Sequence, residues 1–146
     1  MKFDDLQRQI IMDHYKHPQN KAEETPAGYV SKRGLNPSCG DDVTIFLLLE
    51  DGVVTDLKWN GDGCSICCAS ASIMTNEFVG QTIEQLDEKY ENFKQMVSGH
   101  EYDVDAFEDA VCFNGIKDYP ARFKCAIISW DTAYQLVKGD SDGQGH

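Results

Sequence analysis

Residues 61–72, GDGCSICCASAS, mark the point where a strand passes into a helix. The alternating pattern before Gly61 ends at a Gly-x-Gly turn, and the small residues that follow recur at helical spacing. Cys64 is therefore expected at the N-terminus of a helix, where unpaired backbone N–H groups and the helix dipole favour a thiolate over a thiol. The pattern predicts that Cys64 binds a metal or reacts.

A β-hairpin is expected immediately before this junction. Residues 43–50 and 53–60 are rich in β-branched and aromatic residues, and Asp51-Gly52 between them is typical of a type I′ turn. The first strand is apolar on both faces, which predicts a central strand. The second strand alternates, which predicts one solvent-exposed face. Its inward positions are expected to be Val53, Thr55, Leu57 and Trp59.

Helical patterns occur on both sides of the hairpin in the sequence. We expect helices at residues 3–16, from Cys64 to Gly80, from the capping box Thr82/Gln85 to about Val97, at 103–115, and from Tyr119-Pro120 onward. Residues 19–37 are polar and rich in turn signals, so we expect a mobile surface segment with at most a short strand near Tyr29-Val30. The chain is predicted to be one α+β domain over residues 1–146, with a flexible tail at 139–146.

The composition excludes several classes of partner. A formal net charge of −12 disfavours nucleic acid and anionic membranes, because both are bound chiefly by neutralising phosphate. The charged start of the chain and the lack of a long apolar run argue against a signal peptide and a membrane span. We therefore expect a cytoplasmic protein whose acidic surface favours basic protein partners.

The six cysteines are better interpreted as metal ligands or reactive thiols than as disulfides, because cytosolic thiols stay reduced. Cys112 is an exception, since it lies in an apolar periodic segment and is expected to be a small buried hydrophobe. His14 and His17 lie three residues apart, a spacing that permits joint ligation, but lone surface histidines are commoner.

Four side chains can be assembled into a metal site. Cys39 and Asp41 form a C-x-D pair before the first long strand, and the hairpin returns Cys64 to the same edge of the sheet. Cys125, early in the last helix and off its apolar stripe, could complete a tetrahedral Cys₃Asp site of the kind that zinc accepts.

Cys67 offers an alternative fourth ligand. With Cys39 and Cys125, the Cys64-x₂-Cys67 spacing would give a closed Cys₄ zinc site. Such a site would be structural and would take part in no reaction. Continuation of the helix through Cys67 and Cys68 argues instead that both turn inward or sideways.

Four motifs spread over most of the chain resemble the NifU-N/IscU-like family of iron–sulfur assembly proteins. They are NPSCGD at 36–41, GCSI at 63–66, ASAS at 69–72 and ARFKC at 121–125. Within the family the chain is similar to the SufU branch. Lys124 stands where scaffold-type members have a histidine, and the long spacing from Cys64 to Cys125 is consistent with a helical insertion at residues 82–100.

The resemblance implies a SufE/NifU-like fold, a small antiparallel sheet packed against helices, with a metal site at one edge of the sheet. It implies a zinc-dependent sulfurtransferase that takes persulfide sulfur from a SufS-like cysteine desulfurase and passes it to a SufBCD-type complex. Cys39 would accept the sulfur, and Cys39, Asp41, Cys64 and Cys125 would bind Zn²⁺. Two alternatives remain open: a scaffold that assembles a [2Fe–2S] cluster, with iron at the same ligands, and a non-catalytic zinc-stabilised adaptor.

Arg122 and Lys124 flank Cys125 and are expected to assist Cys39 in catalysis. Three thiolates and a carboxylate around Zn²⁺ leave a net negative charge, so nearby cations would stabilise the site. The alternative is that both are solvated charges at the start of a helix.

Overall fold

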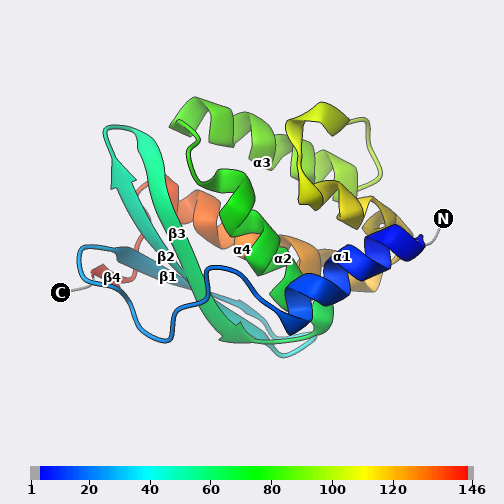
Figure 1. Ribbon diagram of the computed structural model, residues 1–146, viewed down its shortest axis with the longest axis horizontal. Helices are drawn as coiled ribbons and strands as arrows, with labels where there is room; N and C mark the ends of the chain where they lie inside the picture. Colours follow the sequence, from blue (N-terminus) through cyan, green and yellow to red (C-terminus); the bar gives the residue numbers. More distant parts are fainter. Residues whose placement is uncertain (1–3, 145–146) are drawn as a thin grey trace.

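The computed structural model describes residues 4–144 and confirms an α+β fold (Figure 1). The α-helices and strands are α1 (Asp5–Lys16), β1 (Val30–Asn36), β2 (Asp41–Glu50), β3 (Val53–Asp62), α2 (Ser65–Phe78), α3 (Ile83–Val97), α4 (Phe123–Val137) and β4 (Gly143–Gln144). Three short 3₁₀ helices are η1 (Val104–Ala106), η2 (Asp109–Asp118) and η3 (Pro120–Arg122). None of the described helices is both long and apolar enough to cross a bilayer.

The antiparallel sheet has the strand order β3-β2-β1-β4, and helices cover one of its faces. In Figure 1, α2 and α4 form a layer against the sheet, with α2 on β3 and α4 on β1 and β2. α1 packs on α2, and α3 packs on α4 and η2, so they form an outer layer. The aromatic core lies between the layers, where the rings of Phe93 and Trp130 stack with centroids 3.8 Å apart.

The predicted hairpin is confirmed, with one correction. Asp51 and Gly52 both have positive φ, 53° and 74°, as a type I′ turn requires, and β2 is a central strand. The expected inward position of Thr55 is wrong. The register shifts at Leu48/Leu49, so a β-bulge leaves Thr55 exposed and turns Val54 into the core.

The expectation of a mobile surface segment at residues 19–37 is wrong at two places. Residues 30–36 form β1, paired with β2 along its whole length. Nearer the start, the backbones of Asn20 and Ala22 hydrogen-bond to Trp59 at the free edge of β3. Gly34 explains why β1 can lie under α4, because a Cβ at this position would be 2.2 Å from the Thr132 Oγ1.

The helix boundaries agree with the local signals except at two places. The last α-helix is expected from Tyr119-Pro120 onward, but Pro120 begins the 3₁₀ turn η3 and α4 starts at Phe123. The other place is 103–115. There the chain forms the 3₁₀ helices η1 and η2 instead of one short α-helix. In the tail for which we expect flexibility, Gly143 and Gln144 pair with β1, and residues 145–146 lie outside the described part.

Candidate metal centre

Cys39 and Asp41 lie at the turn that connects β1 to β2. Asn36, the last residue of β1, pairs with Asp41, the first residue of β2. The Cys39 N–H donates to the Asn36 carbonyl at 3.3 Å, and Gly40 adopts a left-handed φ of 72°, which favours glycine. Cys39 is half-buried in an exposed turn, whereas Asp41 is buried.

Cys64 arrives from the other side, through the end of β3. β3 passes so close to β2 that position 61 requires glycine, because a Cβ there would lie 2.1 Å from the Asp42 carbonyl oxygen. Cys64 is the N-cap of α2, as predicted, and its sulfur accepts the Cys67 N–H at 3.4 Å. Its own N–H donates to Asp41 Oδ1 at 3.1 Å, so the start of α2 is fixed to the start of β2.

Cys125 lies in the first turn of α4 and is fully buried. It packs with Val43 of β2 and Cys67 of α2. The layer contacts of α4 therefore bring this thiol to the end of the sheet where Cys39 and Asp41 lie.

The structure brings three of the four predicted ligands into one tight group. One ligand atom from each of Cys39, Asp41 and Cys125 lies within 4.8 Å of the others. Cys64 is outside this triad but borders it, through its N–H bond to Asp41 and through side-chain contact with Cys125.

The electrostatics of the group favour a bound cation. Burial of Cys125, with its contacts to Cys39 and Asp41, raises the pKa of its thiol. Burial also acts to raise the pKa of Asp41, but the Cys64 N–H and neighbouring side-chain donors outweigh it and hold that pKa below its ordinary value. A charged carboxylate thus lies beside a thiol that resists ionisation. Among residues 4–142, no ion pair to lysine or arginine compensates Asp41.

This donor set fits zinc. Thiolate sulfur and carboxylate oxygen are accepted Zn²⁺ ligands, and a bound dication would offset the burial, and the smaller effect of neighbouring groups, that raise the pKa of the Cys125 thiol. The same set can also bind iron.

The remaining cysteines lie outside the group of ligand atoms, although Cys67 packs against Cys125. Cys67 is fully buried, and this burial, with the charge of Asp41, raises the pKa of its thiol. The Cys68 sulfur lies 3.7 Å from the Gly63 carbonyl oxygen, and Cys112 is in the main core. The prediction that Cys67 and Cys68 turn inward is confirmed.

Arg122 and Lys124 do not touch the cluster. Within the described part of the chain, no hydrogen bond or ion pair joins either side chain to the cysteines or to Asp41. Lys124 is exposed beside a hollow of about 390 Å³, and its charge acts on Asp131 of the same helix. A catalytic role for these cations stays a prediction.

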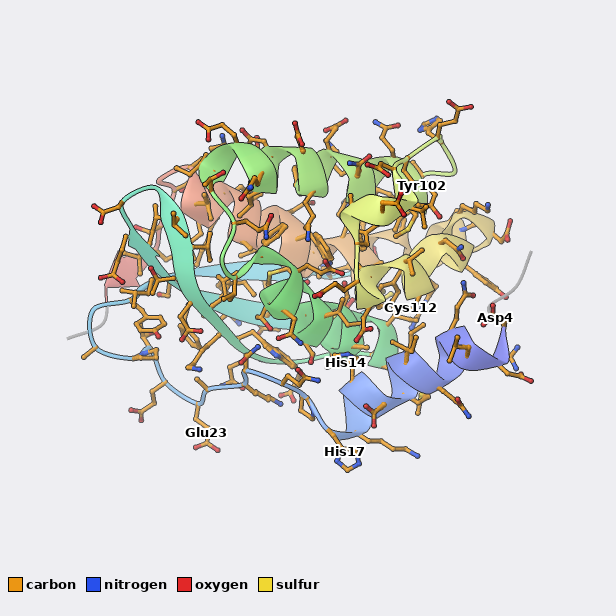
Figure 2. All side chains as sticks on the ribbon, turned by 45° about the horizontal axis from the view of Figure 1, so that its top comes forward. Asp4, His14, His17, Glu23, Tyr102 and Cys112 are labelled. Carbon is orange, nitrogen blue, oxygen red and sulfur yellow. The ribbon has the colours of Figure 1, made fainter. Side chains whose placement is uncertain are left out.

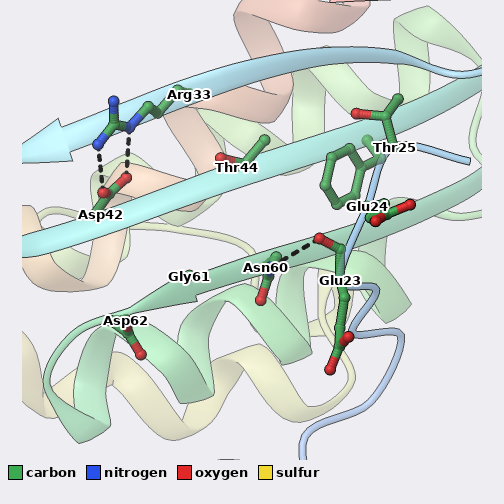
Figure 3. A pocket seen from close by; sticks show the side chains of 10 residues that line it. Glu23, Glu24, Thr25, Arg33, Asp42, Thr44, Asn60, Gly61 and Asp62 are labelled. Carbon is green, nitrogen blue, oxygen red and sulfur yellow. Dashed lines mark hydrogen bonds and ion pairs between the residues drawn. The ribbon is translucent and has the colours of Figure 1, made fainter. Parts of the chain in front are cut away.

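A hollow of about 380 Å³ lies on the open face of the sheet, with no thiol in its lining (Figure 3). Asp42 follows Asp41 in β2 and points to this opposite face, where Arg33 donates to it at 2.8 and 2.6 Å. Asn60 donates to the Glu23 carbonyl across the same hollow. Because side chains alternate between the two faces of a strand, Asp42 forms its ion pair with Arg33 on the solvent-facing side, whereas Asp41 is buried on the other side.

A second polar cluster, with His14 and Ser72 buried and Asp109 exposed, joins α1, α2 and η2. His14 Nδ1 lies 2.8 Å from Ser72 Oγ, and His14 Nε2 lies 3.0 Å from Asp109 Oδ2. Figure 2 shows His17 pointing away from the protein, so the two histidines do not share a site.

Asn36 also belongs to the site, although it was not among the predicted site residues: its amide contacts Asp41 and Cys125. No periodicity indicates such a residue. Its position next to the C-x-D pair was the one available signal.

Comparison with known proteins gives consistent matches. A family model described as "NifU-like N terminal domain" matches residues 6–126. The zinc-dependent sulfurtransferase SufU of Bacillus subtilis is 40% identical over 144 residues, 97% of this chain and 94% of that protein. The iron–sulfur cluster assembly scaffold protein IscU of Thermotoga maritima is 34% identical over 138 residues, 94% of this chain and 96% of that protein.

The solved structures also agree. The crystal structure of FiSufU from Fervidobacterium islandicum AW-1, a candidate cluster assembly scaffold for the SUF system, superposes with a TM-score of 0.76 at 32% identity. The match covers 85% of this chain and 90% of that one.

Proposed function

This chain belongs to the NifU-like N terminal domain family, and we propose that it is a zinc-dependent sulfurtransferase of iron–sulfur cluster assembly. Cys39, Asp41, Cys64 and Cys125 bind the zinc, and Cys39 accepts persulfide sulfur from a cysteine desulfurase. The observation that carries the proposal is the group of Cys39, Asp41 and Cys125 ligand atoms, all within 4.8 Å of one another, in which Asp41 and Cys125 are buried and Cys39 is half-buried. Zinc, when bound, stabilises these thiols as thiolates at neutral pH.

Burial and chain position distinguish the acceptor from the other thiols. Cys125 is fully buried. Cys64 is half-buried like Cys39, but it is the N-cap of α2, so its movement would disturb the start of that helix. Cys39 lies in a turn between the exposed residues Ser38 and Gly40. It can therefore move towards a donor with the smallest change in the fold.

The transfer is a thiol–disulfide exchange. The Cys39 thiolate attacks the outer sulfur of the donor persulfide, the donor S–S bond breaks, and the donor cysteine leaves as a thiolate. Cys39 then carries the persulfide. No external oxidant or reductant is needed, because one S–S bond replaces another.

The partners follow from this chemistry and from the family. The donor is a SufS-like cysteine desulfurase, and a SufBCD-type assembly complex is the downstream acceptor. The net charge of −12 supports docking to surfaces of opposite charge.

A second candidate function is the [2Fe–2S] scaffold. The similarity to the Thermotoga maritima scaffold protein favours it, and Cys₃Asp can ligate iron. Lys124 supports the transfer function instead, because a lysine ammonium has donors only and offers no lone pair to a metal. Lys124 is also exposed and has no contact with the cluster.

The test is to incubate the zinc-loaded chain with a SufS-type desulfurase and cysteine, and to locate added sulfur by peptide mass spectrometry. The proposal predicts one added sulfur on Cys39, none in Cys39→Ser, and normal loading in the control Cys68→Ser. Sulfur loading retained in Cys39→Ser contradicts the acceptor assignment. Bound zinc without any sulfur loading supports the adaptor, and a coloured cluster passed to an apo-acceptor supports the scaffold.

A further inference from the structure

Asn36 is a buried amide that contacts two of the proposed ligands. Its side-chain nitrogen donates to Asp41 Oδ2 at 3.0 Å and lies 3.6 Å from Cys125 Sγ. The residue is 2% exposed. An ionised carboxylate only accepts hydrogen bonds, so the NH₂ group, and not the oxygen, must face Asp41.

Asp41 is held from two sides as a result. The Cys64 N–H binds Oδ1 at 3.1 Å, and the Asn36 amide binds Oδ2 at 3.0 Å. These two bonds fix the carboxylate plane and connect the end of β1 to the start of α2. The direction of the remaining lone pairs is therefore set by Asn36 and Cys64 together.

The main chain of Asn36 reaches a third ligand. Its carbonyl accepts the Cys39 N–H at 3.3 Å, which closes the turn that carries Cys39. One residue thus contacts Cys39 and Asp41 of the β1–β2 turn and Cys125 of α4.

The amide oxygen of Asn36 is buried and has no hydrogen-bond partner among the described residues. A buried unpaired acceptor is unfavourable and calls for an explanation. The donation of the NH₂ group to the buried Asp41 carboxylate explains why an amide occupies this position.

We propose that Asn36 is a positioning residue that orients Asp41 and Cys125 for the metal and strengthens metal binding. Residues that hydrogen-bond to metal ligands in this way typically change the metal affinity by about 10- to 100-fold. The inference rests on the proposed function for the ligand set, but it does not depend on sulfur transfer.

The test compares Asn36→Leu with the unmodified chain and with Asn60→Ala, a control on β3 outside the site. Leucine has nearly the shape of asparagine and removes both the donor and the unpaired oxygen, so the apo variant is expected to fold normally. We expect the zinc Kd, measured by chelator competition, to rise about 10- to 100-fold. The absorption spectrum of the Co²⁺-loaded variant should also change, while Asn60→Ala matches the unmodified chain.

An unchanged zinc Kd and Co²⁺ spectrum in Asn36→Leu would overturn the inference while leaving the proposed function intact. If Asn36→Leu fails to fold, Asn36→Ser provides the same comparison. Weaker zinc binding in a chain that accepts no sulfur supports the inference and contradicts the transfer function. A chain that binds no zinc in its unmodified form overturns both.

Discussion

Two polar clusters in this protein differ in whether their hydrogen-bonding groups all have partners. In the His14–Ser72–Asp109 cluster, both histidine nitrogens have partners, and Ser72 Oγ also accepts the Gln19 N–H at 2.9 Å. In the metal centre, thiols lie against thiols and a carboxylate, and the Asn36 oxygen has no partner.

The comparison shows that residue type alone does not identify a functional site. Ser, His and Asp are the residues of a hydrolase triad, but Ser72 is fully buried and cannot meet a substrate. Its cluster is complete within the chain and therefore stabilises the fold. The cysteine cluster instead has ligand atoms that could hold a metal ion, as we propose.

Removal of the metal should give the largest effect on stability. A ligand present at about a thousandfold above its Kd stabilises the native state by about 4 kcal/mol. For a chain of this size, chelation should therefore lower the melting temperature by roughly 10 °C. Thermal unfolding with and without a strong chelator measures this. An unchanged melting temperature would contradict a stabilising metal in the cysteine cluster.

His14→Ala should have the next largest effect, and it should change only the free energy of unfolding. It leaves the buried Ser72 without one of its partners, at a cost of about 1–3 kcal/mol. Zinc content and sulfur loading should stay unchanged. Urea unfolding compares this variant with His17→Ala, an exposed histidine of the same helix end. A loss of sulfur loading in His14→Ala would show that the two clusters are coupled.

Much of the fold could be predicted because its signals are local. The Asp51-Gly52 turn, the Thr82/Gln85 capping box and the N-cap position of Cys64 each depend on a few neighbouring residues. β1 could not be predicted in this way. Its residues show no clear alternation, and its position depends on Gly34 fitting against Thr132 of α4.

The metal centre likewise has some features that could be predicted from local sequence and others that depend on packing. The hairpin explains why Cys39, Asp41 and Cys64 meet, and this could be inferred from the order of the strands. The offset of Cys64 from the triad and the contacts of Asn36 depend on packing between layers. Neither leaves a pattern in the sequence.

Asp41→Ala should weaken metal binding without abolishing it. A carboxylate is the hardest of the four proposed ligands for borderline-soft zinc, and three thiols remain. We expect about tenfold faster zinc release, equivalent to about 1.4 kcal/mol. Release to a chromogenic chelator measures it. Complete loss of zinc at neutral pH would show that Asp41 is indispensable.

Lys124→Ala should have the smallest effect. Lys124 is exposed and does not contact the cluster, so zinc should stay bound and sulfur loading should fall only about two- to threefold, the range of a screened surface charge. Loading rates at low and high salt give the measurement. A loss of zinc in this variant would mean that Lys124 belongs to the site.

The metal content of anaerobically purified protein tests the central claim most directly, namely that the incomplete cysteine cluster is a zinc site. We expect one colourless zinc per chain, lost in Cys125→Ser and retained in Cys112→Ser. A chain without metal, or one that carries a coloured iron–sulfide species in place of zinc, would contradict it.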